Sequence, residues 1–395
     1  MKFVSMSFPG RFEDAFLYMG RLFTITENQS VRVYDMKYIV SKLEDDKALL
    51  DAPTLLFFRN DRMDSNRFRD RISDESNKKA FLRAVDKLAS EPINITTDDV
   101  HPIEWDLKIT ADVLLDLNIY NGRAYISTNK GLYHLDLDWE AESIVPIDKA
   151  KKRLDVKCVH TTAKYGTVNA SCGSEGWFSF LDDFQLGTNN TRREKHIPEY
   201  SLRTNWLKYD IVNYPTTISP TLFHSVKIPA SQPLSKTKNN SSLELEDWIV
   251  TDVEDEEFSL DSLFNNLNHG FSLENLQFVH NSSQTLFLST YNGHLFALRL
   301  EGGGLSLPSI SYVSEFEGFR GLVSSLHTVS LGGKPGLVLE TDEQVLLFAH
   351  GKFIPLFHDE VVSIRTFSRS QHYRNVVSIT TSDEVILIAI FDDEA

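Results

Sequence analysis

Two similar stretches decide the fold: AYISTNKGLYHLDL at residues 124–137 and LFLSTYNGHLFAL at residues 286–298. Each contains an apolar strand that ends in Ser-Thr, a short polar turn with a glycine, and a second apolar strand. β-Branched and aromatic residues favour strands, and Asn-Lys-Gly or Tyr-Asn-Gly supplies a residue that tolerates positive φ. Both stretches therefore predict a β-hairpin, with the Ser or Thr before the turn capping its open amide groups.

The same pattern recurs along the chain. Two clear copies lie at 337–348 and 376–390, and weaker copies lie at 22–34, 168–180 and 248–260. The residues before the turns serve as anchors of the repeat: Thr26, Thr128, Ser171, Thr251, Thr290, Thr341 and Thr381. The steps between successive anchors are 102, 43, 80, 39, 51 and 40 residues. Four of these steps lie near the period of roughly 40–50 residues that is typical of propeller blades.

Both strands of each hairpin are mostly apolar, so we expect sheets that are covered on both faces, as in packed blades. The repeat resembles the β-propeller superfamily, and residues 291–298 resemble a WD40-like or quinoprotein-like blade hairpin. The resemblance implies an all-β propeller of about seven four-stranded blades, with six or eight also open. It indicates no specific family, because the one Trp-Asp pair, Trp105-Asp106, lies outside the repeat. Two packed β-sandwich domains are the alternative.

We expect a single domain over residues 1–395 with two insertions at the long steps. Residues 59–92 form an Arg-rich and helical insertion, and residues 188–245 form a polar, aromatic loop insertion. Ser73 is the expected N-cap of one helix near 73–90. Phe81, Val85 and Leu88 then fall on one apolar face of that helix.

The candidate partner-binding residues come from these insertions, because loops on rigid scaffolds commonly carry function. They are Arg59, Arg62, Arg67, Arg69 and Arg71 in the first, and Trp206, Tyr209 and Tyr214 in the second. Arginines can bind acidic or phosphate groups, and exposed aromatic side chains mark interfaces. The alternatives are that nearby aspartates neutralise the arginines and that the aromatic residues pack in the core.

Composition narrows the class of protein. The formal net charge of −16 argues against a dedicated nucleic-acid binder. The two cysteines, Cys158 and Cys172, predict free thiols in a reducing compartment, so we expect a cytoplasmic protein. No run of eighteen apolar residues and no apolar N-terminal stretch occur, so we expect neither a membrane helix nor a secretory signal.

A search for chemistry finds no zinc spacing, phosphate-binding loop or nucleophile elbow. Cys158 and His160 share one face of a predicted strand, but the neighbouring valines favour simple packing. The acidic run at 252–257 lacks the spacing that wraps calcium. We therefore expect no catalytic, metal or cofactor-binding residue.

These observations predict a non-enzymatic protein–protein interaction scaffold that binds a protein partner through loops and insertions. One alternative is a propeller enzyme, a hydrolase or lyase, with a site at the central channel. The other is an acidic inhibitor or immunity-type protein for a basic partner.

Overall fold

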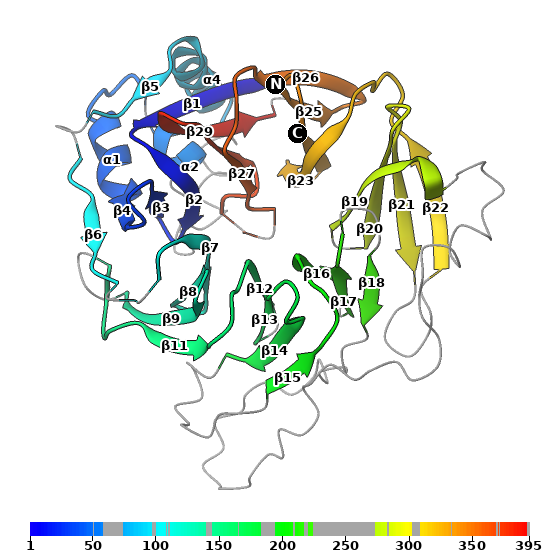
Figure 1. Cartoon of the computed structure of the whole chain (residues 1–395). Helices are drawn as coiled ribbons and strands as arrows, with labels where there is room; N and C mark the ends of the chain where they lie inside the picture. Colours follow the sequence, from blue (N-terminus) through cyan, green and yellow to red (C-terminus); the bar gives the residue numbers. More distant parts are fainter. Residues whose placement is uncertain are drawn as a thin grey trace, which may run out of the picture. The chain divides into compact units, whose positions relative to one another are not determined.

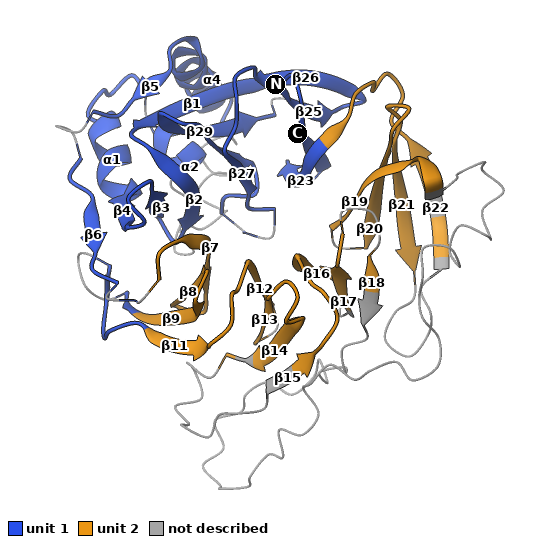
Figure 2. Cartoon of the chain, in the orientation of Figure 1, with its two compact units in different colours: residues 1–109, 137–150, 324–395 blue, residues 110–136, 151–323 orange. Residues whose placement is uncertain are grey.

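The computed structural model describes residues 1–49, 51–57, 74–96, 100–107, 109, 111–139, 144–164, 166–182, 194–207, 210–216, 220–223, 273–282, 284–301, 309–332, 334–368, 370 and 372–392. The chain divides into two compact units (Figure 2). Unit 1 comprises residues 1–109, 137–150 and 324–395, and unit 2 comprises residues 110–136 and 151–323.

Unit 1 contains three sheets (Figure 1). Only the first residue of one of their strands, β23, is assigned to unit 2. The first contains β2 (Phe12–Tyr18), β3 (Arg21–Thr26), β4 (Val31–Asp35) and β6 (Ile103–Trp105). The second contains β23 (Val323–Leu331), β24 (Lys334–Thr341), β25 (Val345–Ala349) and β26 (Lys352–Phe357). The third contains β27 (Ser363–Thr366), β28 (Val376–Thr380), β29 (Glu384–Phe391), β1 (Lys2–Pro9) and β5 (Ile93–Asn94).

The third sheet joins the two ends of the described chain. β1 pairs antiparallel with β29 over eight residue pairs, from Lys2 with Phe391 to Pro9 with Glu384. The inward side chains of β1, Val4, Met6 and Phe8, are almost completely buried. A strand from one end of the chain thus completes a sheet whose other long strands come from the opposite end.

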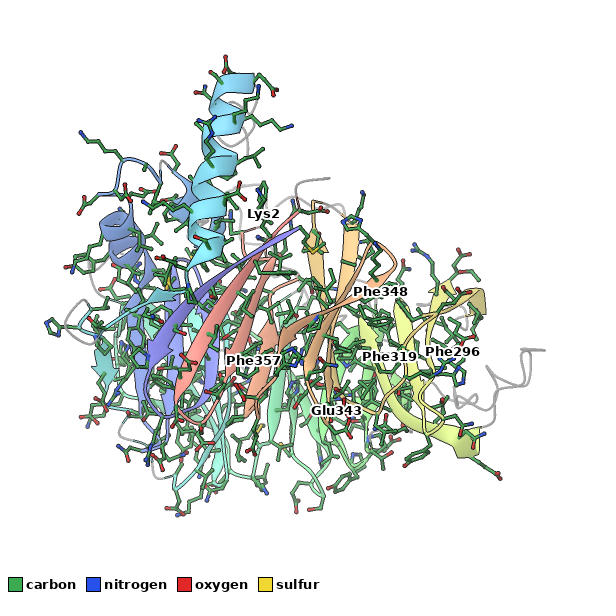
Figure 3. The ribbon with its side chains drawn as sticks, turned by 90° about the horizontal axis from the view of Figure 1, so that it is seen from above. Lys2, Phe296, Phe319, Glu343, Phe348 and Phe357 are labelled. Atoms are coloured by element: carbon green, nitrogen blue, oxygen red, sulfur yellow. The ribbon has the colours of Figure 1, made fainter. Side chains whose placement is uncertain are left out.

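Three helices also lie in unit 1: α1 (Met36–Leu43), α2 (Ala52–Phe57) and α4 (Glu75–Ser90). α4 packs beside β1 (Figure 1), and its Phe81 ring lies 5.7 Å from the Phe391 ring, centroid to centroid. Lys2, which Figure 3 labels at the start of β1, forms an ion pair with Asp86 of α4. The first long step of the repeat therefore contains helices that cover the sheet formed by the chain ends.

Four sheets lie in unit 2, apart from the end of β9 and all of β10, which belong to unit 1. The first contains β7 (Leu114–Tyr120), β8 (Arg123–Thr128), β9 (Gly131–Asp138), β10 (Val145–Pro146) and β11 (Lys151–Leu154). The second contains β12 (His160–Lys164), β13 (Thr167–Ser171), β14 (Trp177–Leu181) and β15 (Glu194–Ile197). The third contains β16 (Arg203–Leu207), β17 (Asp210–Tyr214) and β18 (Thr221–Phe223). The fourth contains β19 (Leu276–Ser282), β20 (Thr285–Thr290), β21 (Leu295–Glu301) and β22 (Ser309–Glu315), preceded by the short 3-10 helix η2 (Leu273–Asn275).

The predicted hairpins are confirmed except the one at 248–260, which lies outside the described residues, and the fold is an all-β propeller with few helices. β3, β8, β13, β20 and β24 end at the expected anchors, and β28 ends one residue before Thr381. The hydroxyls of Thr128 and Thr341 bond to backbone groups of the turns that follow them. Every residue of β8, β13 and β28 is buried, as expected for a second strand covered on both faces.

Three expectations need correction. The N-cap of α4 is Asp74 and not Ser73, because the Asp74 carboxylate accepts from the Ser76 and Asn77 amides. One helix was expected, and two more, α1 and α2, are present. The apolar face of the expected helix, Phe81, Val85 and Leu88, is buried as predicted. β15, β16, β17 and β18 lie within the segment expected to be a loop insertion, and Trp206 of β16 and Ile211 of β17 are buried in one cluster.

Six of the described sheets have four or five strands, and the sheet β16–β17–β18 has three. Seven four-stranded blades are therefore not confirmed. Thr251, one expected anchor, lies outside the described residues. Within the described ranges, no helix is long and apolar enough to cross a membrane.

The closing strand yields the first testable prediction. Met6→Ala should lower the free energy of unfolding by about 2–4 kcal/mol, because it leaves a cavity beneath the ladder that joins β1 to β29. Urea denaturation followed by tryptophan fluorescence measures this change. Ser5→Ala, one residue earlier on the less buried face of β1, is the control and should change stability by less than about 0.5 kcal/mol. Equal effects of the two substitutions would show that the inward face of β1 contributes little.

Candidate functional site

In each sheet of unit 2, the first strand begins at the edge of the sheet where the anchor turn lies. The anchor turn is the turn that follows the second strand. β7, β12, β16 and β19 are neighbours in that order, since β12 packs beside both β7 and β16, and β16 beside β19. Each is antiparallel to its second strand, so the start of the first strand and the turn after the second strand share one edge. This edge is where exposed apolar side chains of unit 2 gather.

We name these side chains the apolar edge: Val113, Leu115, Tyr200, Leu202, Tyr291 and Leu322. Val113 immediately precedes β7, while Tyr200 and Leu202 precede β16 and Leu322 precedes β23. Tyr291 lies in the turn after Thr290. Tyr291 is 62% exposed and Tyr200 is 47% exposed, which is unusual for large aromatic residues that could pack inward.

A β-bulge explains why Leu115 faces solvent. The register of β7 shifts between Leu114, opposite Thr128, and Asp116, opposite Ser127. β2 has the same shift between Phe12 and Asp14. A bulge leaves one extra residue outside the regular alternation, so Leu115 is exposed although its neighbours are buried.

Backbone hydrogen bonds hold the apolar edge in place. The Tyr291 amide donates to the Asn275 carbonyl at 2.9 Å, and the Leu202 amide donates to the Tyr214 carbonyl at 3.0 Å. Gly293 has a φ of 78°, and a Cβ there would lie 3.0 Å from the Gly321 amide nitrogen, so the Tyr291 turn fits closely against the segment before Leu322. The exposed side chains therefore stand on ordered backbone.

Arg203 begins β16 directly after Leu202, and its guanidinium lies among aromatic rings. Its Cζ atom is 4.4 Å from the Tyr214 ring centroid and 5.3 Å from the Phe278 ring centroid. One Nη2–H group donates to the Val279 carbonyl at 2.9 Å. Burial lowers the pKa of Arg203, because the charged guanidinium loses hydration without a carboxylate among the described residues to replace it.

A contact between two neighbouring sheets of unit 1 contains a carboxylate in place of an aromatic ring. Asp14 follows the bulge of β2, and Phe278 follows the same bulge of β19. The Asp14 carboxylate accepts from Ser363 at 3.1 Å and from the Arg365 Nε at 2.8 Å, and it also forms an ion pair with the Arg365 Nη2. Phe278 therefore places a phenyl ring beside Arg203 at the register position from which Asp14 of β2 places a carboxylate beside Ser363 and Arg365.

Asp116 of β7 occupies the same register position as Asp14. It follows the bulge of β7 and accepts from the Thr161 amide at 2.7 Å and the Thr161 hydroxyl at 3.0 Å. Both carboxylates are buried and bonded to the first strand of a neighbouring sheet. Asp116 links its sheet to β12 and Asp14 links its sheet to β27, whereas Phe278 offers a phenyl ring to Arg203 of β16.

The predicted partner-binding residues fall into two groups. Arg59, Arg62, Arg67, Arg69, Arg71 and Tyr209 lie outside the described residues, so their role stays a prediction. Trp206 and Tyr214 are buried, with Trp206 packed against Trp177, Ile197 and Ile211. The Tyr214 hydroxyl lies 2.6 Å from the Asn281 side-chain oxygen, and burial raises the pKa of Tyr214 well above its usual range. Their side chains belong to the core and not to an exposed surface.

The cysteine and histidine pair is also part of the packing. The Cys158 thiol lies 3.4 Å from the Ser127 hydroxyl and contacts the His160 backbone carbonyl at 3.9 Å. Both cysteines are buried and unpaired with each other, as expected. Among the described residues, no group of three or more His, Cys, Asp or Glu side chains could hold a metal ion.

The sequence search missed the apolar edge because single exposed residues carry no periodic signal. Leu115 and Leu202 read as ordinary strand residues. The signal that could have found the edge is position: each member lies at the start of a first strand or within an anchor turn. Tyr291 was visible in the quoted hairpin as an aromatic residue at a turn position that polar residues usually fill.

Comparison with known proteins finds similar solved structures but no matching sequence. No family profile matches the chain, and no curated protein sequence matches it. The solved N-terminal domain of Nup159 is 10% identical, with 99% of this chain and 96% of that chain covered and a TM-score of 0.47. The β-propeller domain of Cps50 (Swd1) from Myceliophteria thermophila is 9% identical, with 71% and 98% covered and a TM-score of 0.39. PorZ of Porphyromonas gingivalis is 8% identical, with 96% and 37% covered and a TM-score of 0.43.

The two arginine environments predict opposite responses to the same substitution. Arg365→Met should lower the free energy of unfolding by about 2–3 kcal/mol, because it leaves the buried Asp14 carboxylate without its cation. Arg203→Met should leave stability unchanged within about 1 kcal/mol or raise it, because methionine removes a desolvated charge that has no carboxylate partner. Urea denaturation of both variants measures the difference. A larger loss for Arg203→Met than for Arg365→Met would contradict this account of the two sites.

Proposed function

We propose that the chain is a non-enzymatic protein–protein interaction scaffold and that its partner binds the apolar edge. The single observation that carries this proposal is the gathering of exposed Val, Leu and Tyr side chains at one edge of unit 2. Large apolar side chains that stay exposed cost free energy in water, and a partner that covers them recovers it. Tyrosine is among the residues most enriched in binding hot spots.

The ordered backbone of the apolar edge is a second argument for binding, in addition to the exposure of its side chains. Tyr291 and Leu202 are fixed by hydrogen bonds to Asn275 and Tyr214. A surface that is already ordered loses little conformational entropy when it binds, so more of the contact energy appears as affinity. This arrangement suits a docking surface better than a loop that must fold first.

The propeller-enzyme and inhibitor alternatives stay predictions. One group of buried titratable residues in unit 2 has structural partners: Arg123 pairs with Asp136 at 2.6 Å and with Asp182 at 3.2 Å. The Tyr125 hydroxyl lies 2.9 Å from Asp182, and burial with that negative charge raises the pKa of Tyr125. Such a closed network suits packing between sheets.

We also propose that β16–β17–β18 belongs to a seventh blade, which would complete the repeat expected from the sequence. Its strand order is that of the other sheets, and its first strand lies between β12 and β19. A fourth strand paired to β18 in an experimental structure would support this count. The buried thiols of Cys158 and Cys172, which form no disulfide, suit a reducing compartment, and on that basis we propose a cytoplasmic location.

The test is a comparison of three forms of the full chain. The edge variant carries Tyr200→Ser, Leu202→Ser, Tyr291→Ser and Leu322→Ser. The matched control carries Tyr38→Ser and Ile147→Ser, which remove exposed apolar side chains from unit 1. Thermal unfolding should be similar for all three, because exposed positions contribute little to stability.

Each form is immobilised and exposed to extract from the native cell, and captured proteins are quantified by mass spectrometry. We expect at least one protein that the wild type and the control capture equally and that the edge variant loses by tenfold or more, a change of about 1.4 kcal/mol or greater in binding. Identical capture by the edge variant and the wild type would refute the assignment of the apolar edge.

A further inference from the structure

Arg203 differs from three other arginines of the described chain that are also at least partly buried. Arg21, Arg123 and Arg365 each form an ion pair with at least one aspartate, at side-chain exposures of 15%, 9% and 23%. Arg203 contacts one carbonyl and two rings, and none of its contacts among the described residues is a carboxylate. A guanidinium carries five N–H donors. Among the described residues, Arg203 donates to one acceptor, the Val279 carbonyl.

The location of Arg203 makes its donors accessible to a docked partner. The residue follows the exposed Leu202, and its guanidinium contacts Phe278 of the sheet whose turn carries Tyr291. The residue as a whole is only partly buried, although its guanidinium has lost most of its hydration. A protein that covers Leu202 and Tyr291 therefore brings its own side chains close to the guanidinium.

Resting on the proposed function, we propose that Arg203 is a specificity residue of the apolar edge that binds the carboxylate of an Asp or Glu flanked by apolar residues in the partner. The ion pair between Arg365 and Asp14 is an example in which the chain itself supplies the carboxylate that binds an arginine. At Arg203 the equivalent aspartate is replaced by Phe278, so the carboxylate comes from the partner.

The surroundings favour a carboxylate over a phosphate. Phosphate sites commonly gather several arginines or backbone amides around a doubly charged group. Here one guanidinium stands between aromatic rings and beside apolar side chains, which matches a single negative charge with apolar neighbours. The aromatic faces also support the guanidinium in a planar, two-pronged contact with the carboxylate.

The test uses a phage library of random dodecapeptides selected against the immobilised full chain. Enriched peptides are synthesised, and their dissociation constants are measured by fluorescence anisotropy. We expect enrichment of Asp or Glu beside Leu, Phe or Trp. Replacing the acidic residue by its amide should weaken binding at least tenfold, and binding should weaken further with added salt.

Variants of the chain then separate the inference from the function on which it rests. Arg203→Gln should weaken binding at least tenfold, Arg203→Lys should recover only part of it, and Ile147→Ser should change nothing. Peptides that depend on Tyr291 and Leu322 but not on Arg203 would overturn the role of Arg203 and leave the docking surface intact. Failure to select any peptide that depends on the apolar edge would overturn both proposals. Tighter binding of a phosphoserine version than of the acidic peptide would overturn the carboxylate in favour of a phosphopeptide.

Discussion

The ladder between β1 and β29 is the constraint on which unit 1 depends. It joins residues 2–9 to residues 384–391, so one sheet cannot form until both ends of the chain are present. Met6 and Leu387 face each other across this ladder, and both are fully buried. The helix α4 then packs on the same sheet through Phe81. A long-range pairing of this kind forms late and slowly, but once formed it resists opening because eight residue pairs must separate together.

Within unit 2, the sheets are held by local hydrogen bonds at the anchor turns and between neighbouring first strands. Thr128 and Thr290 cap their turns, and side chains such as Asp116 bond to the next first strand. These bonds satisfy backbone groups that would otherwise remain unpaired at the inner edge of each sheet. Because of these bonds, the apolar edge stands on fixed backbone. Phe278 cannot form such a bond, and Arg203 beside it contacts no carboxylate among the described residues.

The sequence predicted the hairpins well because their signal is local. Turn residues such as Gly293 and anchors such as Thr341 determine each hairpin within about a dozen residues. β17 was not recognised as a repeat because it ends in Tyr214-Pro215, without the Ser or Thr anchor, although Tyr214 lies 43 residues after Ser171. The environment of Arg203 was not predictable, because it depends on Phe278, a residue 75 positions away.

The central claim is that a partner covers the apolar edge in the cell. Covalent side-chain footprinting tests it directly when the same chain is labelled in its native cells and as purified protein. The account predicts that Tyr200, Leu202, Tyr291 and Leu322 are modified several-fold less in cells, whereas Tyr38 and Ile147 are modified equally in both samples. Equal modification of all six residues in cells and in the purified protein would contradict it.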